Sequence, residues 1–291
     1  MKDDDLRRII RTRATEPAAI AEAAAKRPRP TSLLGEHGRL MMIAADHPAR
    51  AALGVGDRPF AMADRADLLD RLCLALSRPG VNGVLGTPDI IEDLLLLGAL
   101  DGLVVFGSMN RGGIAGSVFE LDDRFTAYDA SSLAAMGAQG GKMLLRIDPH
   151  DPATVSTVES CGRAVSSLAD AGLFAMIEPF WSRRVGGKVT NELTVAAMTR
   201  AVTVAAGVGN TSAYTWLKVP VVPDMAQVMA ATTLPAVILG GEVSGDPDAA
   251  FEAWRSALAL PTVQGLVVGR ALLYPPDDDV AGAVDTAVSL L

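Results

Sequence analysis

Lysines are few in this chain, and two of them occur where a charged side chain is unusual. The 291-residue sequence has lysine only at positions 2, 26, 142, 188 and 218. Lys218 lies inside the apolar run 213–220 and Lys142 begins another apolar run, and such runs are typical of buried β-strands. A lysine is almost never fully buried without a partner or a function. Lys218 is therefore our first candidate for a reactive residue.

A buried lysine suggests an amine that attacks a carbonyl carbon and forms a Schiff base. A lysine with an ordinary pKa of about 10.4 is protonated at neutral pH and cannot attack. Burial or a second cation lowers the pKa of a lysine, and Lys142 could supply that second cation to Lys218. In the structural alternative, Lys218 extends its amine from a strand end into solvent. The corresponding alternative for Lys142 is an ion pair with a carboxylate.

Two carboxylates follow apolar runs, at the positions where strands are expected to end. Glu178 follows the run 173–177 and precedes a proline, and Asp46 follows the run 40–45. Glu178 is placed as a general acid or base would be, and a salt bridge to one of the lysines is compatible with that role. Asp46 could assist proton transfer, bind a substrate hydroxyl group or cap the following loop.

Two later apolar runs end in glycine. Gly240 and Gly241 follow the run 236–239, and Gly269 and Arg270 follow the run 263–268. Glycine lacks Cβ and lets a phosphate approach the backbone N–H groups closely. Arg270 adds a charged donor. These four residues are therefore predicted to bind phosphate.

Short apolar runs alternate with segments of helical spacing along most of the chain. We expect strands at 40–45, 81–85, 103–106, 142–147, 173–177, 215–219, 236–239 and 263–268. Helices are expected at 65–76, 131–137, 154–171, 192–206, 225–231 and 247–258. Eight such strands over about 250 residues predict an α/β fold of the (β/α)₈ (TIM) barrel type. A doubly wound sheet is the main competitor, but no glycine-rich fingerprint follows the first strand. Residues 1–37 are expected to form an N-terminal helical extension of the same domain as the barrel, which spans 38–291.

Alternation within the strands predicts which side chains face the barrel interior. Polar residues occupy even positions at Lys142, Arg146 and Asp148, positions 143, 145 and 147 are apolar, and Leu144 is the exception. The same parity directs Lys218 and the two strand-end carboxylates inward. Active sites of these barrels lie at the C-terminal ends of the strands. The reactive residues are thus expected to meet there.

Composition excludes several other classes of function. The formal net charge is −8 and no basic run follows the N-terminal region, so nucleic-acid binding is not expected. No apolar run reaches the ~18 residues that span a bilayer, and the charged N-terminus is unlike a signal peptide. We expect a cytoplasmic protein that does not contact membranes.

No metal or cofactor is expected from the histidines and cysteines. His37, His47 and His150 occur in unrelated contexts, and Cys73 and Cys161 show no zinc-ligand spacing. A metal site built from Asp46 and His47 is disfavoured because adjacent strand residues point in opposite directions.

Three segments together carry a family resemblance. Leu217-Lys-Val-Pro220, Pro235-Ala-Val-Ile-Leu-Gly-Gly241 and Gly265-Leu-Val-Val-Gly-Arg270 resemble the second half of class I aldolases of the tagatose-bisphosphate and archaeal-type fructose-bisphosphate group. The segments 140–149 and 175–178 look most like the tagatose-bisphosphate branch, and 43–47 is similar to its Asp-His element. The resemblance covers about residues 38–285.

The resemblance implies a role for each matching residue. Lys218 would form the iminium with a ketose-phosphate carbonyl, Glu178 and Lys142 would serve proton transfer and electrostatics, and Asp46 would be the catalytic carboxylate of strand one. Gly240, Gly241, Gly269 and Arg270 would hold phosphate, and His47 would contact the substrate. Pro48 stands where a glycine is usual, and the archaeal-type tyrosine acid/base has no counterpart, which gives Glu178 a larger share of the proton transfer.

The chain also looks like an actinobacterial subgroup of aldolase-like barrels associated with myo-inositol catabolism. The implied substrate is 5-dehydro-2-deoxygluconate 6-phosphate, which would be cleaved to dihydroxyacetone phosphate and malonate semialdehyde. Arg146 is the first candidate to bind its carboxylate, with Arg111 and Arg183 as alternatives. Homo-oligomers are the rule in this group. A tagatose or fructose (bis)phosphate aldolase, a phosphate-binding isomerase or epimerase, and a non-catalytic sugar-phosphate sensor remain alternatives.

Overall fold

Eight parallel strands close into a barrel in the computed structural model, which describes residues 3–241 and 247–291. The ring order is β9-β1-β2-β3-β4-β5-β7-β8, and β6 adds an antiparallel extension to the end of β5. The strands are β1 Leu40–Ala44, β2 Gly83–Gly86, β3 Val104–Ser108, β4 Gly140–Ile147, β5 Phe174–Val185, β6 Lys188–Asn191, β7 Thr215–Val219, β8 Ala236–Leu239 and β9 Val263–Val268. The predicted (β/α)₈ barrel is therefore confirmed.

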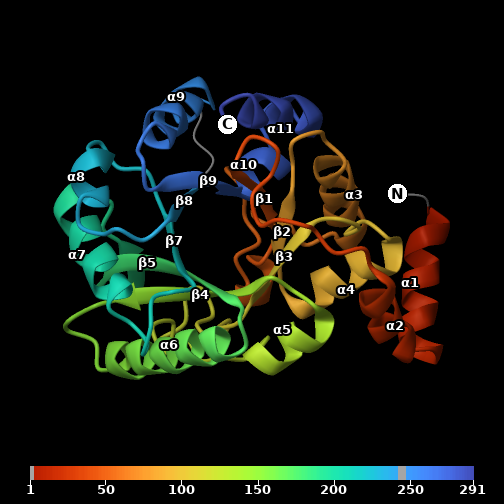
Figure 1. Ribbon diagram of the computed structural model, residues 1–291, viewed down its shortest axis with the longest axis horizontal. Helices are drawn as coiled ribbons and strands as arrows, with labels where there is room; N and C mark the ends of the chain where they lie inside the picture. Colours follow the sequence, from red (N-terminus) through yellow and green to blue (C-terminus); the bar gives the residue numbers. More distant parts are fainter. Residues whose placement is uncertain (1–2, 242–246) are drawn as a thin grey trace.

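Helices surround the barrel as an outer layer (Figure 1). They are α1 Asp3–Thr15, α2 Ala18–Lys26, α3 Arg65–Leu76, α4 Pro88–Leu97, α5 Ala130–Met136, α6 Ala153–Asp170, α7 Val195–Ala206, α8 Met225–Met229, α9 Pro247–Leu258, α10 Arg270–Leu273 and α11 Val280–Val288, with a short 3₁₀ helix, η1, at Pro48–Arg50. Helix starts follow local chemistry. The side chain of Asp64, for example, accepts hydrogen bonds from the backbone N–H groups of Ala66 and Asp67 at the start of α3.

Alternation along the strands separates two apolar cores. The odd positions of β4, such as Met143 and Leu145, pack against the helices in the large outer core. The smaller core fills the barrel interior with Leu40, Met42, Ala44, Leu85, Val104, Phe106, Met176, Trp216, Val237 and Val267. Leu33 and Leu34, which precede β1, pack against this interior core. Because apolar side chains fill the interior, the inward-facing polar side chains gather at the C-terminal ends of the strands.

Strand β5 is longer than the sequence predicted. We expected it to end at Ile177 before Pro179, but it runs to Val185 and turns into the hairpin with β6. Pairing of β5 with β7 stops at Ile177, whereas pairing with β4 continues to Trp181. Beyond Ile177, β5 is an edge strand on its β7 side, where a proline is tolerated.

Two helices near the chain termini and one after β2 were also not predicted as such. Helix α4 begins with Pro88 in its first turn and ends at Gly98, which is left-handed, but its leucine run hides the helical spacing. The N-terminal segment forms two helices because Pro17 interrupts them, and α11 was not predicted. Figure 1 shows α1 and α2 outside the ring of helices, beside α4. Arg13 of α1 donates to Glu92 and Asp93 of α4 at 2.9 Å each.

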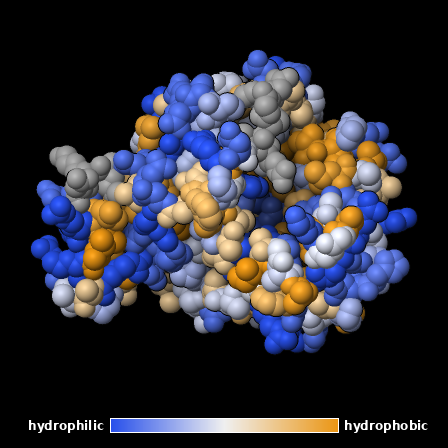
Figure 2. Space-filling view, turned by 180° about the vertical axis from the view of Figure 1, so that it is seen from behind, coloured by the Kyte–Doolittle hydropathy of each residue, from blue (hydrophilic) through white to orange (hydrophobic). Residues whose placement is uncertain are grey.

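The face opposite to that of Figure 1 is hollowed near its centre, with hydrophilic residues inside the hollow (Figure 2). Among the residues that the structure describes, no helix is both long enough and apolar enough to cross a bilayer.

Candidate active site

Four of the predicted reactive residues meet at the C-terminal ends of the barrel strands. Lys142 is on β4, Glu178 on β5 and Lys218 on β7, and Asp46 follows β1. In the β5–β7 register Ile177 is opposite Leu217, so the next residues along the two strands, Glu178 and Lys218, lie side by side. Inward alternation thus brings together residues that are up to 172 positions apart in the sequence.

Glu178 lies between the two lysines. Its Oε1 accepts a hydrogen bond from Lys218 Nζ at 2.8 Å, and its Oε2 forms an ion pair with Lys142 Nζ. Lys142 Nζ also donates to Asp46 Oδ2 at 3.0 Å. The four side chains therefore form one continuous chain of contacts from Lys218 to Asp46. Such a chain can both hold charge and move a proton next to the Lys218 amine.

Asp46 has two further partners from β3 and the loop that follows it. Ser108, which is opposite Lys142 in the β3–β4 register, donates its hydroxyl to Asp46 Oδ2 at 3.0 Å. Arg111 Nη1 lies 3.1 Å from the same oxygen and donates to the Asp46 backbone carbonyl at 3.2 Å. The hydroxyl and the guanidinium fix the orientation of the carboxylate toward Lys142.

The cluster holds more cations than carboxylates. Among the described residues, the cations joined by these contacts are Lys142, Lys218 and Arg111, and the carboxylates are Asp46 and Glu178. The exposed fraction of these side chains is 11 % for Glu178 and 5 % or less for the other four. An uncompensated buried charge is costly. The excess positive charge of the cluster is removed if a lysine releases its proton or if an anion binds.

The pKa values of the cluster follow from this imbalance. Burial opposes ionisation of Asp46, but Arg111 and Lys142 outweigh it and hold the pKa of Asp46 well below its usual range. Burial is likewise outweighed at Glu178, whose pKa is lowered by Lys142 and Lys218. For Lys142, burial and then the charge of Arg111 lower the pKa to about 8, against the attraction of the two carboxylates. Both carboxylates are thus ionised at neutral pH, and Lys142 can exchange its proton near that pH.

His47 lies next to this cluster and is neutral at physiological pH. Burial, together with Arg270 and Lys218, lowers the pKa of His47 to about 3 against the attraction of Asp46. Its Nδ1 is 3.8 Å from Asp46 Oδ1 and has no hydrogen-bond partner among the described residues. Pro48 occupies the first turn of the 3₁₀ helix that begins after His47, where its fixed φ fits. In the described ranges, no three His, Cys, Asp or Glu side chains gather as metal ligands would.

The predicted phosphate-binding residues lie together at the ends of β8 and β9, which pair in the barrel. A Cβ at Gly269 would collide with the Ala44 carbonyl oxygen, so the close approach of this segment to β1 requires glycine. Gly241 has a left-handed φ of 69° and open space where a Cβ would stand. Arg270 Nη1 donates to the Gly54 carbonyl at 3.3 Å, and its buried Nε has no partner in the described part of the chain. The loop that continues from Gly241 lies outside the described residues.

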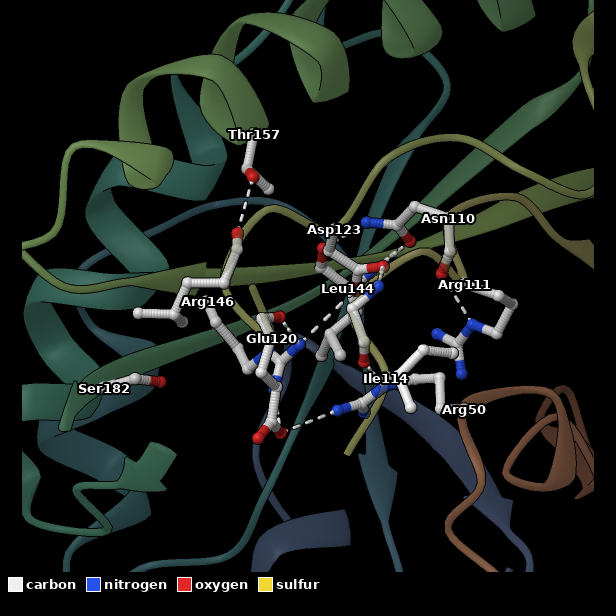
Figure 3. A network of polar contacts seen from close by, with 12 residues as sticks. Arg50, Asn110, Arg111, Ile114, Glu120, Asp123, Leu144, Arg146, Thr157 and Ser182 are labelled. Atoms are coloured by element: carbon white, nitrogen blue, oxygen red, sulfur yellow. Dashed lines mark hydrogen bonds and ion pairs between the residues drawn. The ribbon is translucent and has the colours of Figure 1, made fainter. Parts of the chain in front are cut away.

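The three arginines that were candidates for a substrate carboxylate lie in different settings. Arg146 is buried, donates to both the side chain and the backbone of Glu120, and lies near Asp123. Arg183 is on the β5–β6 hairpin, mostly exposed, and pairs with Glu192 at 3.0 Å. Arg111 is the candidate that contacts the lysine cluster directly. Figure 3 shows Arg146 and Arg50 meeting at Glu120, whereas Arg111 lies to one side beside Asn110.

Two residues that support the site were not predicted from the sequence. Ser108 continues the inward parity of Val104 and Phe106, so it would have been found had β3 been extended by two residues. Asn110, two residues beyond the end of β3, is fully buried and bonds the backbone of β4. Its side-chain amide donates to the Leu144 carbonyl at 2.6 Å, and its side-chain oxygen accepts from the Leu144 N–H at 2.7 Å. These bonds extend the β3–β4 contact to the level of the cluster.

The fold and the site define a (β/α)₈ barrel with a buried lysine–carboxylate cluster at the C-terminal ends of its strands. The chain belongs to the Cgl0159-like family, whose model matches residues 38–288. The crystal structure of Cgl0159 from Corynebacterium glutamicum is 53% identical, covers 100% of this chain and 97% of its own, and superposes with a TM-score of 0.97.

Two more distant solved structures share the fold. A Schiff-base-forming fructose-1,6-bisphosphate aldolase is 18% identical over 93% of this chain and 99% of its own, with a TM-score of 0.65. An archaeal fructose 1,6-bisphosphate aldolase is 17% identical over 93% and 98%, also with a TM-score of 0.65. No curated protein matches this chain. At such low sequence identity, the similarity to the two aldolases establishes only that they share the fold of this chain.

Proposed function

We propose that this protein is a class I aldolase that cleaves a ketose phosphate through a Schiff base on Lys218. The observation that carries the proposal is the contact of Lys218 Nζ with Glu178 Oε1 at 2.8 Å, inside a buried cluster with an excess of cations. Glu178 contacts both Lys218 and Lys142, so it gives the Lys218 amine a partner for the proton transfers of Schiff-base formation. The two distant fold relatives are both aldolases, and one of them forms a Schiff base, which agrees with this chemistry.

The proposed reaction begins at the substrate carbonyl. The Lys218 amine attacks the carbonyl carbon, and Glu178 transfers the protons that let the carbinolamine lose water and become the iminium. A base then removes the proton of the hydroxyl group β to the iminium carbon, and Asp46 with Lys142 is placed to do so. The C–C bond breaks, its electron pair moves to the iminium to give an enamine, and an aldehyde leaves. Protonation of the enamine carbon and hydrolysis by water release the ketone phosphate and the free lysine.

The proposed substrate lies across the mouth of the barrel, from the phosphate-binding residues at the ends of β8 and β9 past Lys218. Its phosphate is bound by the backbone of Gly240, Gly241 and Gly269 and by Arg270, and His47 lies between this end and the cluster. The proposed substrate is 5-dehydro-2-deoxygluconate 6-phosphate, as in myo-inositol catabolism, and the products are dihydroxyacetone phosphate and malonate semialdehyde.

Borohydride reduction in the presence of dihydroxyacetone phosphate tests the proposal. An aldolase gives a covalent triose-phosphate adduct in the intact mass and loses activity, and it also releases malonate semialdehyde from the full substrate. A phosphate-binding isomerase or epimerase gives no adduct. A non-catalytic sensor binds the phosphate and can form the adduct, but it releases no aldehyde. No adduct on a folded protein that binds dihydroxyacetone phosphate would refute the Schiff-base proposal.

A further inference from the structure

We propose that Arg111 binds the carboxylate of the aldehyde half of the substrate and so selects carboxylated aldehydes over uncharged ones. The inference rests on the proposed aldolase function, because it assigns the end of the substrate that lies away from the phosphate. It makes Arg111 a specificity-determining residue in addition to its contact with Asp46.

An unused donor of Arg111 is the first observation. Its Nε donates to the Asn110 carbonyl at 2.6 Å, and its Nη1 contacts Asp46. Its Nη2 is buried and has no hydrogen-bond partner among the residues that the structure describes. The free Nη2 belongs to the same guanidinium whose Nη1 contacts Asp46, and Asp46 in turn accepts a hydrogen bond from Lys142. A buried donor without a partner is costly, and a bound acceptor would relieve that cost.

The charge balance of the two neighbouring networks is the second observation. Arg50 and Arg146 form ion pairs with Glu120 and Asp123, so two cations meet two carboxylates and the network is balanced. The cluster that contains Arg111 has three cations and two carboxylates in the described part of the chain. Before a lysine releases its proton, this excess charge favours binding of an anion, and Arg111 has the free donor for it, whereas Arg146 is assigned to holding the loop through Glu120.

The position of Arg111 in the barrel is the third observation. In the ring order, β3, which precedes Arg111, is four strands from β8 and so directly opposite it. The proposed phosphate site lies at β8 and β9, and Lys218 on β7 is next to it. A substrate whose phosphate lies at β8 and whose carbonyl reaches Lys218 therefore directs its other end toward β3.

The chemistry of the free donor favours a carboxylate over a second phosphate. The side chain of Arg111 is 5 % exposed, and one Nη2 group remains free. A small planar carboxylate can be bound by a guanidinium edge, whereas a phosphate dianion has three acceptor oxygens and needs more donors than this position offers. The aldehyde half is thus expected to be a short oxo acid.

Condensation with two matched aldehydes tests the proposal. Dihydroxyacetone phosphate is combined with malonate semialdehyde or with propanal, which has the same number of carbons and no carboxylate. We expect Arg111→Gln to lower kcat/KM for malonate semialdehyde by about 10- to 100-fold more than kcat/KM for propanal, the range of one hydrogen bond to a charged group. Arg255→Gln, in an exposed pair with Glu252, is the control and should change neither.

The outcomes separate binding from a structural role. Arg111 also contacts Asp46, so a merely structural role would lower both reactions by the same factor and would overturn the proposal. An unchanged preference for the carboxylated aldehyde would overturn it as well. Borohydride trapping of dihydroxyacetone phosphate should persist in Arg111→Gln, which shows that the Lys218 half of the site is intact.

A binding measurement that needs no turnover distinguishes failure of this inference from failure of the aldolase proposal. Calorimetry with 3-hydroxypropanoate should detect binding to the wild-type protein, and 1-propanol should not bind. Arg111→Gln should weaken the binding at least tenfold. If the wild-type protein forms no Schiff base but binds 3-hydroxypropanoate through Arg111, the aldolase proposal fails and the carboxylate site stands. If 3-hydroxypropanoate does not bind, or binds equally well to the variant, the site assigned to Arg111 is refuted.

Discussion

The excess of positive charge in the buried cluster predicts that removing a carboxylate and removing a lysine have unequal effects on stability. Asp46→Asn would leave three cations with one carboxylate, Glu178. Lys142→Met would leave two cations and two carboxylates. In that variant Asp46 keeps Arg111 at 3.1 Å and Ser108 at 3.0 Å, and Glu178 keeps Lys218 at 2.8 Å.

The magnitudes follow from burial. Breaking a buried ion pair so that a charge is left uncompensated costs about 3–5 kcal/mol, which is our expectation for Asp46→Asn. Methionine has a length similar to that of lysine, and volume-conserving exchanges usually cost less than about 1.5 kcal/mol, which is our expectation for Lys142→Met. With an unfolding entropy of about 2.1 cal/mol/K per residue, the 291-residue chain loses roughly 1.6 °C in Tm per kcal/mol. The expected losses are then about 5–8 °C for Asp46→Asn and less than about 2.5 °C for Lys142→Met.

Thermal unfolding at pH 7, followed by circular dichroism and by calorimetry, measures both variants under the same conditions. Glu252→Gln is the matched control for loss of a carboxylate, because Glu252 forms an exposed pair with Arg255, and it should stay within about 0.5 kcal/mol of wild type. Equal losses for Asp46→Asn and Lys142→Met, or a larger loss for Lys142→Met, would contradict the charge imbalance.

Three further predictions concern the surroundings of the cluster. Burial lowers the pKa of His47 from 6.5 to about 3, so the contribution of the neutral imidazole to stability is complete above pH 6.5 and is lost as the pH falls toward 3. At pH 5 the loss is up to about 2 kcal/mol, or about 3 °C in Tm. The pH dependence of Tm in His47→Asn should lack this loss. Asn110→Leu leaves the backbone N–H and C=O of Leu144 without their side-chain partner, which should lower the free energy of unfolding by about 2–4 kcal/mol and Tm by about 3–6 °C. An unchanged Tm would show that water replaces both bonds. Gly269→Ala places a Cβ against the Ala44 carbonyl, which should strain the loop by about 1–3 kcal/mol. We expect this strain to weaken the binding of dihydroxyacetone phosphate, measured by calorimetry. Unaltered affinity would argue against a phosphate site at this loop.

Strand parity accounts for how much of the site the sequence could predict. The alternation within β4, and the positions of Glu178, Lys218 and Asp46 at the ends of apolar runs, were visible in the sequence because each depends on local periodicity. A closed barrel then requires inward-facing residues at the strand ends to meet. The fold and the four central residues therefore needed no knowledge of long-range contacts.

The residues of the β3–α5 loop could not be assigned in the same way. Arg111 contacts Asp46 across 65 positions, and Asn110 bonds Leu144 across 34. Loop conformation is set by such distant partners and has no period in the sequence. For this reason the sequence left Arg146, Arg111 and Arg183 as alternative candidates to bind the substrate carboxylate. The structure places the three arginines in different surroundings. The longer β5 was missed for a related reason, because the tolerance of Pro179 depends on where its neighbour β7 ends.

Mapping the site of the borohydride adduct identifies the nucleophilic lysine. Wild-type protein, Lys218→Met and Lys142→Met are each reduced with dihydroxyacetone phosphate, digested and analysed by peptide mass spectrometry. We expect a triose-phosphate adduct on Lys218 in the wild type and in Lys142→Met, and none in Lys218→Met. An adduct on Lys142, or an adduct that survives in Lys218→Met, would contradict the assignment of Lys218 as the nucleophile.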